Sequence, residues 1–281
     1  MMQRSTGLPD GELSYAVSGD GARIAFRRFG AGRPLILIGG AFNDRDSMIA
    51  GGPMAALLAG DFAVFAYDRR GRGDSTDSPP FAVEREIDDL AALIAGAGEP
   101  AFLFGHSSGG ALALEAAIAG LPVAGMAVYE PPYSETQAEE AESKAFVAEL
   151  DRLLAAGDHA AAAQFWLVGT GAPEEMVDGM RGEPYWPGMV GMAPTLACDA
   201  AVMRHGGDSF VPAARIAGIG VPLLAMAGGD SPGFMRNAAR RIAAAAPFGR
   251  HLELAGENHM VSPKAVAPAL RSFFASIGAA T

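Results

Sequence analysis

Short, almost entirely apolar runs recur along this chain, and turns and helical segments separate them. Five such runs lie at residues 35–38, 62–67, 101–104, 123–129 and 222–227. Runs of this kind are typical of strands that are buried on both faces of a sheet. Because strand-like and helix-like segments alternate, the pattern predicts a mostly parallel sheet with helices packed on both of its faces.

The remaining segments complete this pattern. Residues 13–17 and 23–26 alternate around a Gly19-Asp20-Gly21 turn and predict a hairpin, and a last strand is expected at residues 251–254. Periodicity predicts helices at residues 47–58, 83–97, 110–120, 234–246 and 265–277.

The alternation stops at Pro131-Pro132 and resumes only near residue 207. The stretch between is helical in pattern, carries both tryptophans and is rich in methionine. The simplest interpretation is a core of residues 1–132 and 207–281 into which residues 133–206 are inserted as a helical cap.

Charge and cysteine content limit the partners and the compartment. A net charge of −11 disfavours nucleic acid and anionic membranes as partners, because both require clustered lysine and arginine. Cys198 is the only cysteine, so no internal disulfide can form, which predicts a reducing, cytoplasmic environment. Residues 1–13 are polar and lack the apolar core of a signal peptide. With no Cys/His cluster at metal-site spacing, we expect no metal ion and no organic cofactor.

Ser107 stands in Gly105-His106-Ser107-Ser108-Gly109, between the run at 101–104 and the helix expected from residue 110. A sharp strand-to-helix turn forces such a serine outward, and small residues two positions before and after it allow the backbones to approach. The N–H of Ser108 then begins the helix and can face an incoming oxyanion. This context predicts a nucleophilic serine.

Four motifs, in this order, resemble those of the α/β-hydrolase family over nearly the whole chain. They lie at residues 37–42, 67–75, 105–109 and 256–260. The resemblance implies the α/β-hydrolase fold, a mostly parallel eight-stranded sheet with helices on both faces and an inserted helical cap. In one departure, the family usually has His-Gly where this chain has Gly39-Gly40, which changes the hydrogen bonding of that loop but keeps the N–H of Ala41.

A serine hydroxyl needs an adjacent base, and His259 is the candidate. It lies in the loop after the last expected strand, and the order serine, acid, histidine is that of the family. His106 flanks the serine but is expected to point away from it.

Two carboxylates compete to orient His259. The family often places its acid in the loop after the strand at 222–227, where Asp230 stands one residue before the matching position, which Ser231 occupies. The family's second site is the end of the preceding strand, where Glu130 precedes two stiffening prolines. We favour Glu130 and keep Asp230 as the alternative.

The resemblance also assigns the oxyanion hole to the backbone N–H groups of Ala41 and Ser108. Phe42, Trp166 and Trp186 are candidates to line the substrate pocket, with packing in the cap's own core as the alternative. The arginine-rich loop at 68–75 lacks Gly-Lys-Ser/Thr, so it is expected to brace the fold and not to bind phosphate.

The predicted function is therefore a serine hydrolase that cleaves a small, largely apolar ester, lactone or thioester through an acyl-enzyme intermediate. The same residues would also serve a C–C bond hydrolase or a cofactor-free haloperoxidase or perhydrolase. An alternative of another class is a ligand-binding protein on a hydrolase scaffold with little turnover. In each case the partner is a small molecule, and the sequence leaves the oligomeric state open.

Overall fold

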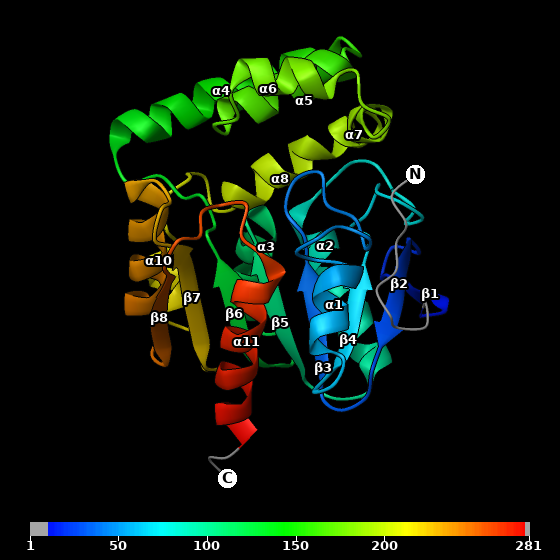
Figure 1. Ribbon diagram of the computed structural model, residues 1–281, viewed down its shortest axis with the longest axis vertical. Helices are drawn as coiled ribbons and strands as arrows, with labels where there is room; N and C mark the ends of the chain where they lie inside the picture. Colours follow the sequence, from blue (N-terminus) through cyan, green and yellow to red (C-terminus); the bar gives the residue numbers. More distant parts are fainter. Residues whose placement is uncertain (1–10, 279–281) are drawn as a thin grey trace.

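The computed structural model describes residues 11–278 and contains an eight-stranded sheet (Figure 1). The strands are β1 (Leu13–Val17), β2 (Arg23–Phe29), β3 (Pro34–Ile38), β4 (Ala63–Tyr67), β5 (Ala101–His106), β6 (Val123–Tyr129), β7 (Leu223–Gly228) and β8 (Gly249–Leu254). Their spatial order is β1-β2-β4-β3-β5-β6-β7-β8. The β1–β2 and β2–β4 pairs are antiparallel and the other neighbouring pairs are parallel, which confirms the predicted sheet. The polar residues 1–10 of the N-terminal stretch lie outside the described residues.

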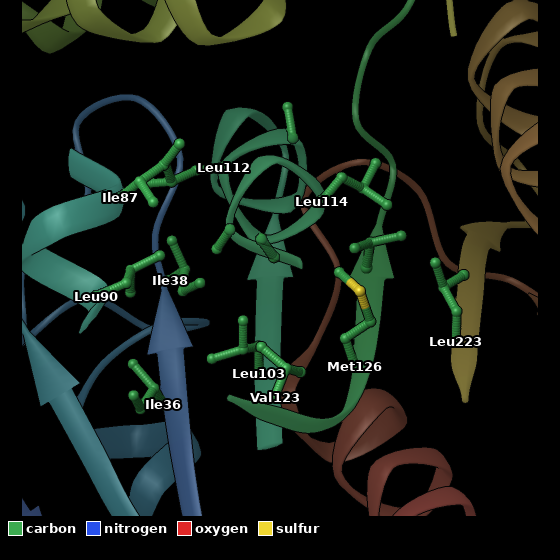
Figure 2. Packing of buried hydrophobic residues seen from close by; sticks show 14 of the residues in the cluster. Ile36, Ile38, Ile87, Leu90, Leu103, Leu112, Leu114, Val123, Met126 and Leu223 are labelled. Carbon is green, nitrogen blue, oxygen red and sulfur yellow. The ribbon is translucent and has the colours of Figure 1, made fainter. Parts of the chain in front are cut away.

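Helices cover both faces of the sheet. They are α1 (Gly52–Leu58) and α11 (Pro263–Gly278) on one face, and α2 (Val83–Ala97), α3 (Ser108–Ile118), α9 (Ala213–Ile216) and α10 (Gly233–Ala245) on the other. Alternate residues of each central strand serve the two faces. Ile36 and Ile38 pack toward α2, as Figure 2 shows, whereas Leu35 and Leu37 face the opposite layer. The continuous apolar runs of the sequence follow from this burial on both sides.

One predicted helix boundary is wrong. The helix expected from residue 47 begins only at Gly52. Before it, the Ser47 amide donates to the carbonyl of Asp44 and the Gly52 amide donates to that of Arg45, so the chain folds into compact turns. Pro53 then takes its place in the first helical turn, where its missing N–H has no cost.

Between β6 and β7 the chain forms a layer of helices above the ends at which the parallel strands finish (Figure 1). They are α4 (Gln137–Ala155), α5 (His159–Gly169), α6 (Glu174–Met180), α7 (Trp186–Met192), the short 3-10 helix η1 (Ala193–Thr195) and α8 (Leu196–Met203). The two connections to this layer lie side by side, because the Ser134 amide donates to the Ser209 carbonyl at 2.8 Å. The exact division into core and cap stays a prediction. None of the helices within residues 11–278 combines the length and apolar character needed to cross a bilayer.

Candidate active site

Ser107 occupies the turn between β5 and α3, at a φ of 56° and a ψ of −129°. Close backbone approach explains the glycines around it. A Cβ on Gly105 would lie 2.3 Å from the carbonyl oxygen of Gly109, and a Cβ on Gly109 would lie 2.3 Å from that of Ile38. Neither distance is sterically allowed, so only glycine permits this turn, which holds the serine at the end of its strand.

Strained backbone marks the same region. Among residues 11–278, the non-glycine residues with positive φ are Phe42, Ser107 and Glu130, at 56°, 56° and 47°. Such conformations cost free energy and persist where the surrounding structure enforces them, often at functional sites. All three residues follow neighbouring parallel strands, β3, β5 and β6. The strained backbone is therefore concentrated at the C-terminal ends of the central strands.

His259 lies in the loop between β8 and α11 and bridges the other two polar groups. Its Nε2 is 3.2 Å from Ser107 Oγ, and its Nδ1 is 2.9 Å from Glu130 Oε2. With the carboxylate at Nδ1, the imidazole carries its proton there and leaves Nε2 free to accept the serine proton. The histidine side chain is 28% exposed, so the imidazole is reached by solvent.

Glu130 follows β6 directly and is fully buried. Its second oxygen, Oε1, accepts the backbone N–H of Gly228 at 2.7 Å. Burial alone would raise the pKa of Glu130, but the hydrogen bonds from His259 and Gly228 outweigh it and hold that pKa below its usual value. The group at Nδ1 is therefore a carboxylate, as an orienting residue requires.

The structure places Asp230 away from His259. Asp230 is exposed and its amide donates to the carbonyl of Glu257, while its carboxylate makes no hydrogen bond or ion pair to any residue of the described range 11–278. The next residue, Ser231, is buried near Glu130. The loop after β7 thus presents a serine, not a carboxylate, at the position next to the histidine's partner.

Two aromatic side chains to which the sequence assigned no role, His106 and Tyr129, hold the His259 loop. His106 Nε2 donates to the carbonyl of His259 at 2.9 Å, and Tyr129 Oη donates to the carbonyl of Asn258 at 2.7 Å. The two residues are register partners at the ends of β5 and β6. Within residues 11–278 His106 makes no hydrogen bond to Ser107, and its ring lies 4.9 Å from that of His259. The sequence around His259 contains no signal of these two hydrogen bonds, because they come from strands far away in the chain.

The candidate oxyanion groups come from two segments beside the serine, the loop after β3 and the start of α3. A Cβ built on Gly40 would lie 2.8 Å from Ser107 Cβ, so the loop that carries Ala41 passes directly over the turn. Ser108 is the first residue of α3. Within residues 11–278, neither the Ala41 nor the Ser108 amide donates to a protein acceptor, so both are available to a ligand oxygen.

The three candidate pocket residues have different surroundings. Trp186 is 8% exposed and belongs to the apolar cluster that the inserted helices form with one another, which favours packing. Trp166 is half-buried against Phe146, with the two rings edge to face at 5.5 Å. Phe42 reaches the same cluster from the loop beside Ser107. Phe42 therefore joins the inserted helices to the site.

Comparison with known proteins agrees with this architecture. A family model described as the alpha/beta hydrolase family matches residues 35–269. The crystal structure of an alpha/beta hydrolase from Sphaerobacter thermophilus DSM 20745 is 45% identical to this chain, with a TM-score of 0.83, over 93% of this chain and 100% of that one.

Two more distant structures have a similar fold. Esterase RhEst1 from Rhodococcus sp. ECU1013 is 22% identical, with a TM-score of 0.67, over 95% of this chain and 99% of that one. The N-formylmaleamic acid deformylase of Pseudomonas putida S16 is 19% identical, with a TM-score of 0.63, over 94% and 100%. At these identities the likeness concerns the fold alone. A search among curated proteins finds no match.

Proposed function

Because the chain belongs to the alpha/beta hydrolase family, we propose that it is a serine hydrolase that cleaves a small, largely apolar ester, lactone or thioester. One observation carries the proposal: Glu130, His259 and Ser107 form a continuous hydrogen-bonded chain, with contacts of 2.9 Å and 3.2 Å. This is the connectivity that a serine nucleophile requires, a base within reach of the hydroxyl and a carboxylate that fixes the base.

In the first half of the reaction, His259 Nε2 takes the proton of Ser107 Oγ as that oxygen bonds to the substrate carbonyl carbon. The carbonyl oxygen becomes an oxyanion, which the N–H groups of Ala41 and Ser108 stabilise. His259 then gives its proton to the departing alcohol or thiol as the bond to the leaving group breaks. The product is an acyl ester on Ser107, and Glu130 stabilises the imidazolium throughout.

In the second half, His259 removes a proton from water, and the resulting oxygen attacks the acyl carbon. The same two N–H groups receive the second oxyanion. Collapse returns the proton to Ser107 and releases a carboxylic acid, so the cycle consumes one water and needs no further reactant.

The surroundings of the oxyanion loop support an apolar acyl group. Ala41 and Phe42 pack against the apolar cluster of the inserted helices, together with half-buried Phe165, Trp166 and Met189. Aromatic and methionine side chains form adaptable apolar walls. A substrate whose acyl end lies against them would place its carbonyl at Ser107.

The first experiment separates catalysis from binding. A fluorophosphonate should label the wild-type protein and not Ser107→Ala, and wild-type activity on 4-nitrophenyl esters should be lost in the same variant. Ser276→Ala, which changes an exposed serine on α11, is the matched control and should label normally. Labelling that persists in Ser107→Ala would contradict the proposal.

A substrate panel then defines the leaving group. The panel compares kcat/KM for esters of increasing acyl length, for lactones and for thioesters. Two further assays, hydrolysis of a diketone and peroxide-dependent halogenation, test for C–C hydrolase and haloperoxidase activity. Ester, lactone or thioester turnover above that in those two assays is expected. Turnover confined to either of them would replace the proposed substrate class.

A further inference from the structure

A buried network of charges lies directly behind the candidate oxyanion hole. Arg69, Arg72, Glu86 and Asp199 are each at most 2% exposed. Arg69 binds Glu86 through two hydrogen bonds and Asp199 through a third, and Arg72 Nη2 binds the other oxygen of Asp199 at 2.7 Å. Asp199 belongs to α8, in the inserted helices, whereas the arginines follow β4 in the core. The network therefore crosses between the two layers.

Arg72 determines which way one oxyanion donor faces. Its Nη1 donates to the carbonyl oxygen of Gly40 at 2.6 Å. That carbonyl and the N–H of Ala41 belong to one planar trans peptide, so they point in opposite directions. With Arg72 behind the carbonyl, the Ala41 N–H is turned to the other side of the loop. Gly40 lies directly over Ser107, so the peptide is fixed beside the nucleophile.

Asp199 also reaches the second donor. Its Oδ1 accepts a hydrogen bond from Ser108 Oγ at 2.6 Å, and the N–H of Ser108 is the other candidate oxyanion group. One carboxylate thus connects to both sides of the hole, directly on one side and through Arg72 on the other. Arg69 adds a contact of 3.2 Å to the Gly39 carbonyl. These arginines supply the hydrogen bonds of a loop that has Gly39-Gly40 in place of the family's His-Gly.

On the basis of the proposed function, we infer that Arg72 and Asp199 are positioning residues that fix the oxyanion hole, and that the hole is complete only when α8 is seated on the core. Neither residue touches the substrate. Arg72 acts through the Gly40–Ala41 peptide, and Asp199 acts through Arg72 and Ser108. A small misplacement of a catalytic group slows the reaction strongly. We therefore expect substitutions in this network to lower kcat more than they weaken substrate binding.

The same loop contains a matched control. Arg70 is also buried and makes a two-point ion pair, with Asp89, through contacts of 2.9 and 2.7 Å. This pair faces α2 and Asp20, and it makes no hydrogen bond to the oxyanion loop or to α3. If both arginines had a purely structural role, replacing either one would change kcat to the same extent.

The test compares Arg72→Lys with Arg70→Lys, which both keep the charge and lose the planar fork. Thermal unfolding, kcat and KM should be measured on the 4-nitrophenyl ester that the wild type cleaves best. Both variants should lose stability. Arg72→Lys should lower kcat on the order of 10²-fold with KM nearly unchanged, whereas Arg70→Lys should keep the wild-type kcat. Equal kcat values for the two folded variants would overturn the inference.

Ser108→Ala keeps the test decisive if Arg72→Lys does not fold, since it deletes one hydroxyl and leaves the Ser108 N–H in place. We expect kcat to fall about 10-fold with KM unchanged, because the contact to Asp199 is lost while the amide remains. A wild-type kcat in Ser108→Ala would overturn the inference. A wild type that neither labels at Ser107 nor cleaves any substrate of the panel would instead contradict the proposed function.

Discussion

At the scale of single residues, the orienting carboxylate is the clearest test of the site. Glu130→Gln keeps the shape of the side chain but removes the charge that stabilises the imidazolium and fixes the proton on Nδ1. We expect kcat to fall about 10³–10⁴-fold, because the contact of 2.9 Å to His259 can then form with the wrong tautomer. Asp230→Asn should leave kcat nearly unchanged, since that side chain is exposed and apart from His259. Similar losses in the two variants would show that Glu130 has no special role.

The family resemblance narrowed the acid to Glu130 or Asp230, because the family places its acid after either of two strands, and these strands are neighbours in the sheet. The sequence favoured Glu130 but kept Asp230 as an alternative. The decision depends on the turn after β6, where a φ of 47° aims Glu130 inward, and on the Gly228 amide that binds it. Both features belong to loop geometry, which apolar patterning does not specify.

His106 leads to a prediction about pH. Burial, and then the proximity of His259, lower the pKa of His106 to about 3. The unfolded chain takes up a proton there near pH 6.5, whereas the folded protein does not, so this residue destabilises the fold progressively as the pH falls from about 6.5 toward 3. The largest slope from one such group is about 1.4 kcal/mol per pH unit.

The measurement is the free energy of unfolding by urea at several values between pH 5 and 6.5, where most carboxylates remain ionised. His106→Gln retains an N–H that can donate to the His259 carbonyl and removes the titrating ring. Its stability should fall less steeply with decreasing pH than that of the wild type. Parallel pH curves for the two proteins would show that His106 is not the source of the dependence.

At the scale of elements, the base of the inserted helices depends on a single carboxylate. Glu140 on α4 accepts two hydrogen bonds from Arg204 at 3.0 and 2.9 Å, and it also accepts from the amide and hydroxyl of Ser209. It therefore ties the segment that enters this layer to the segment that leaves it. The hydrogen bonds from Arg204 outweigh burial and lower the pKa of Glu140 well below its usual value.

Glu140→Gln should destabilise the protein by about 1.5–3 kcal/mol at pH 7, as expected for losing hydrogen bonds to a charged group. A carboxylate with a lowered pKa stabilises the fold above the pKa of the unfolded chain and loses that effect as the pH falls below it. The difference from wild type should therefore shrink as the pH falls through about 4.3, the pKa of glutamate in the unfolded chain, and should be smaller at pH 4 than at pH 7. Urea unfolding at pH 7 and pH 4 measures it.

Glu149→Gln provides the control for that experiment. Glu149 lies on the same helix and pairs with Arg152, but both side chains are exposed, and exposed pairs contribute little. Its unfolding midpoint should stay close to the wild-type value at both pH values. A loss in Glu149→Gln as large as that in Glu140→Gln would contradict a special role for Glu140.

Element types were predictable where burial was two-sided or periodic, as in β3, β4 and α2. The beginning of α1 was not, because residues 47–51 have helical composition but form turns that hydrogen bonds to Asp44 and Arg45 fix. Local side-chain bonding of this kind competes with helix formation and is not visible in hydrophobic patterning.

At the scale of the whole molecule, the sequence predicted the layers but not the contacts between them. Apolar runs and their order were sufficient for a sheet between two helical layers. The ion pair of Arg72 with Asp199 joins residues 127 positions apart, and nothing in either local sequence pairs them. The connection between the inserted helices and the oxyanion loop could therefore be found only in three dimensions.

The apolar core is divided in the same way as the layers. Two clusters sandwich the sheet, and a third, smaller one holds the inserted helices together. Leu103 of β5 and Leu150 of α4 are both fully buried, the first in the cluster between the sheet and the helices α2 and α3, and the second in the third cluster. We expect the inserted helices to open as a unit while the sheet stays folded.

Native-state hydrogen exchange followed by mass spectrometry tests this expectation with two matched substitutions. Leu103→Ala should lower the stability of the sheet by about 2–5 kcal/mol. It should speed exchange in β3, β5 and β6 without changing α5 and α7, because Leu103 remains packed when only the inserted helices open. Leu150→Ala should speed exchange in both sets, since it destabilises the native state from which both openings start. If Leu103→Ala accelerated hydrogen exchange in α5 and α7 as much as in the strands, the inserted helices and the sheet would unfold as one cooperative unit.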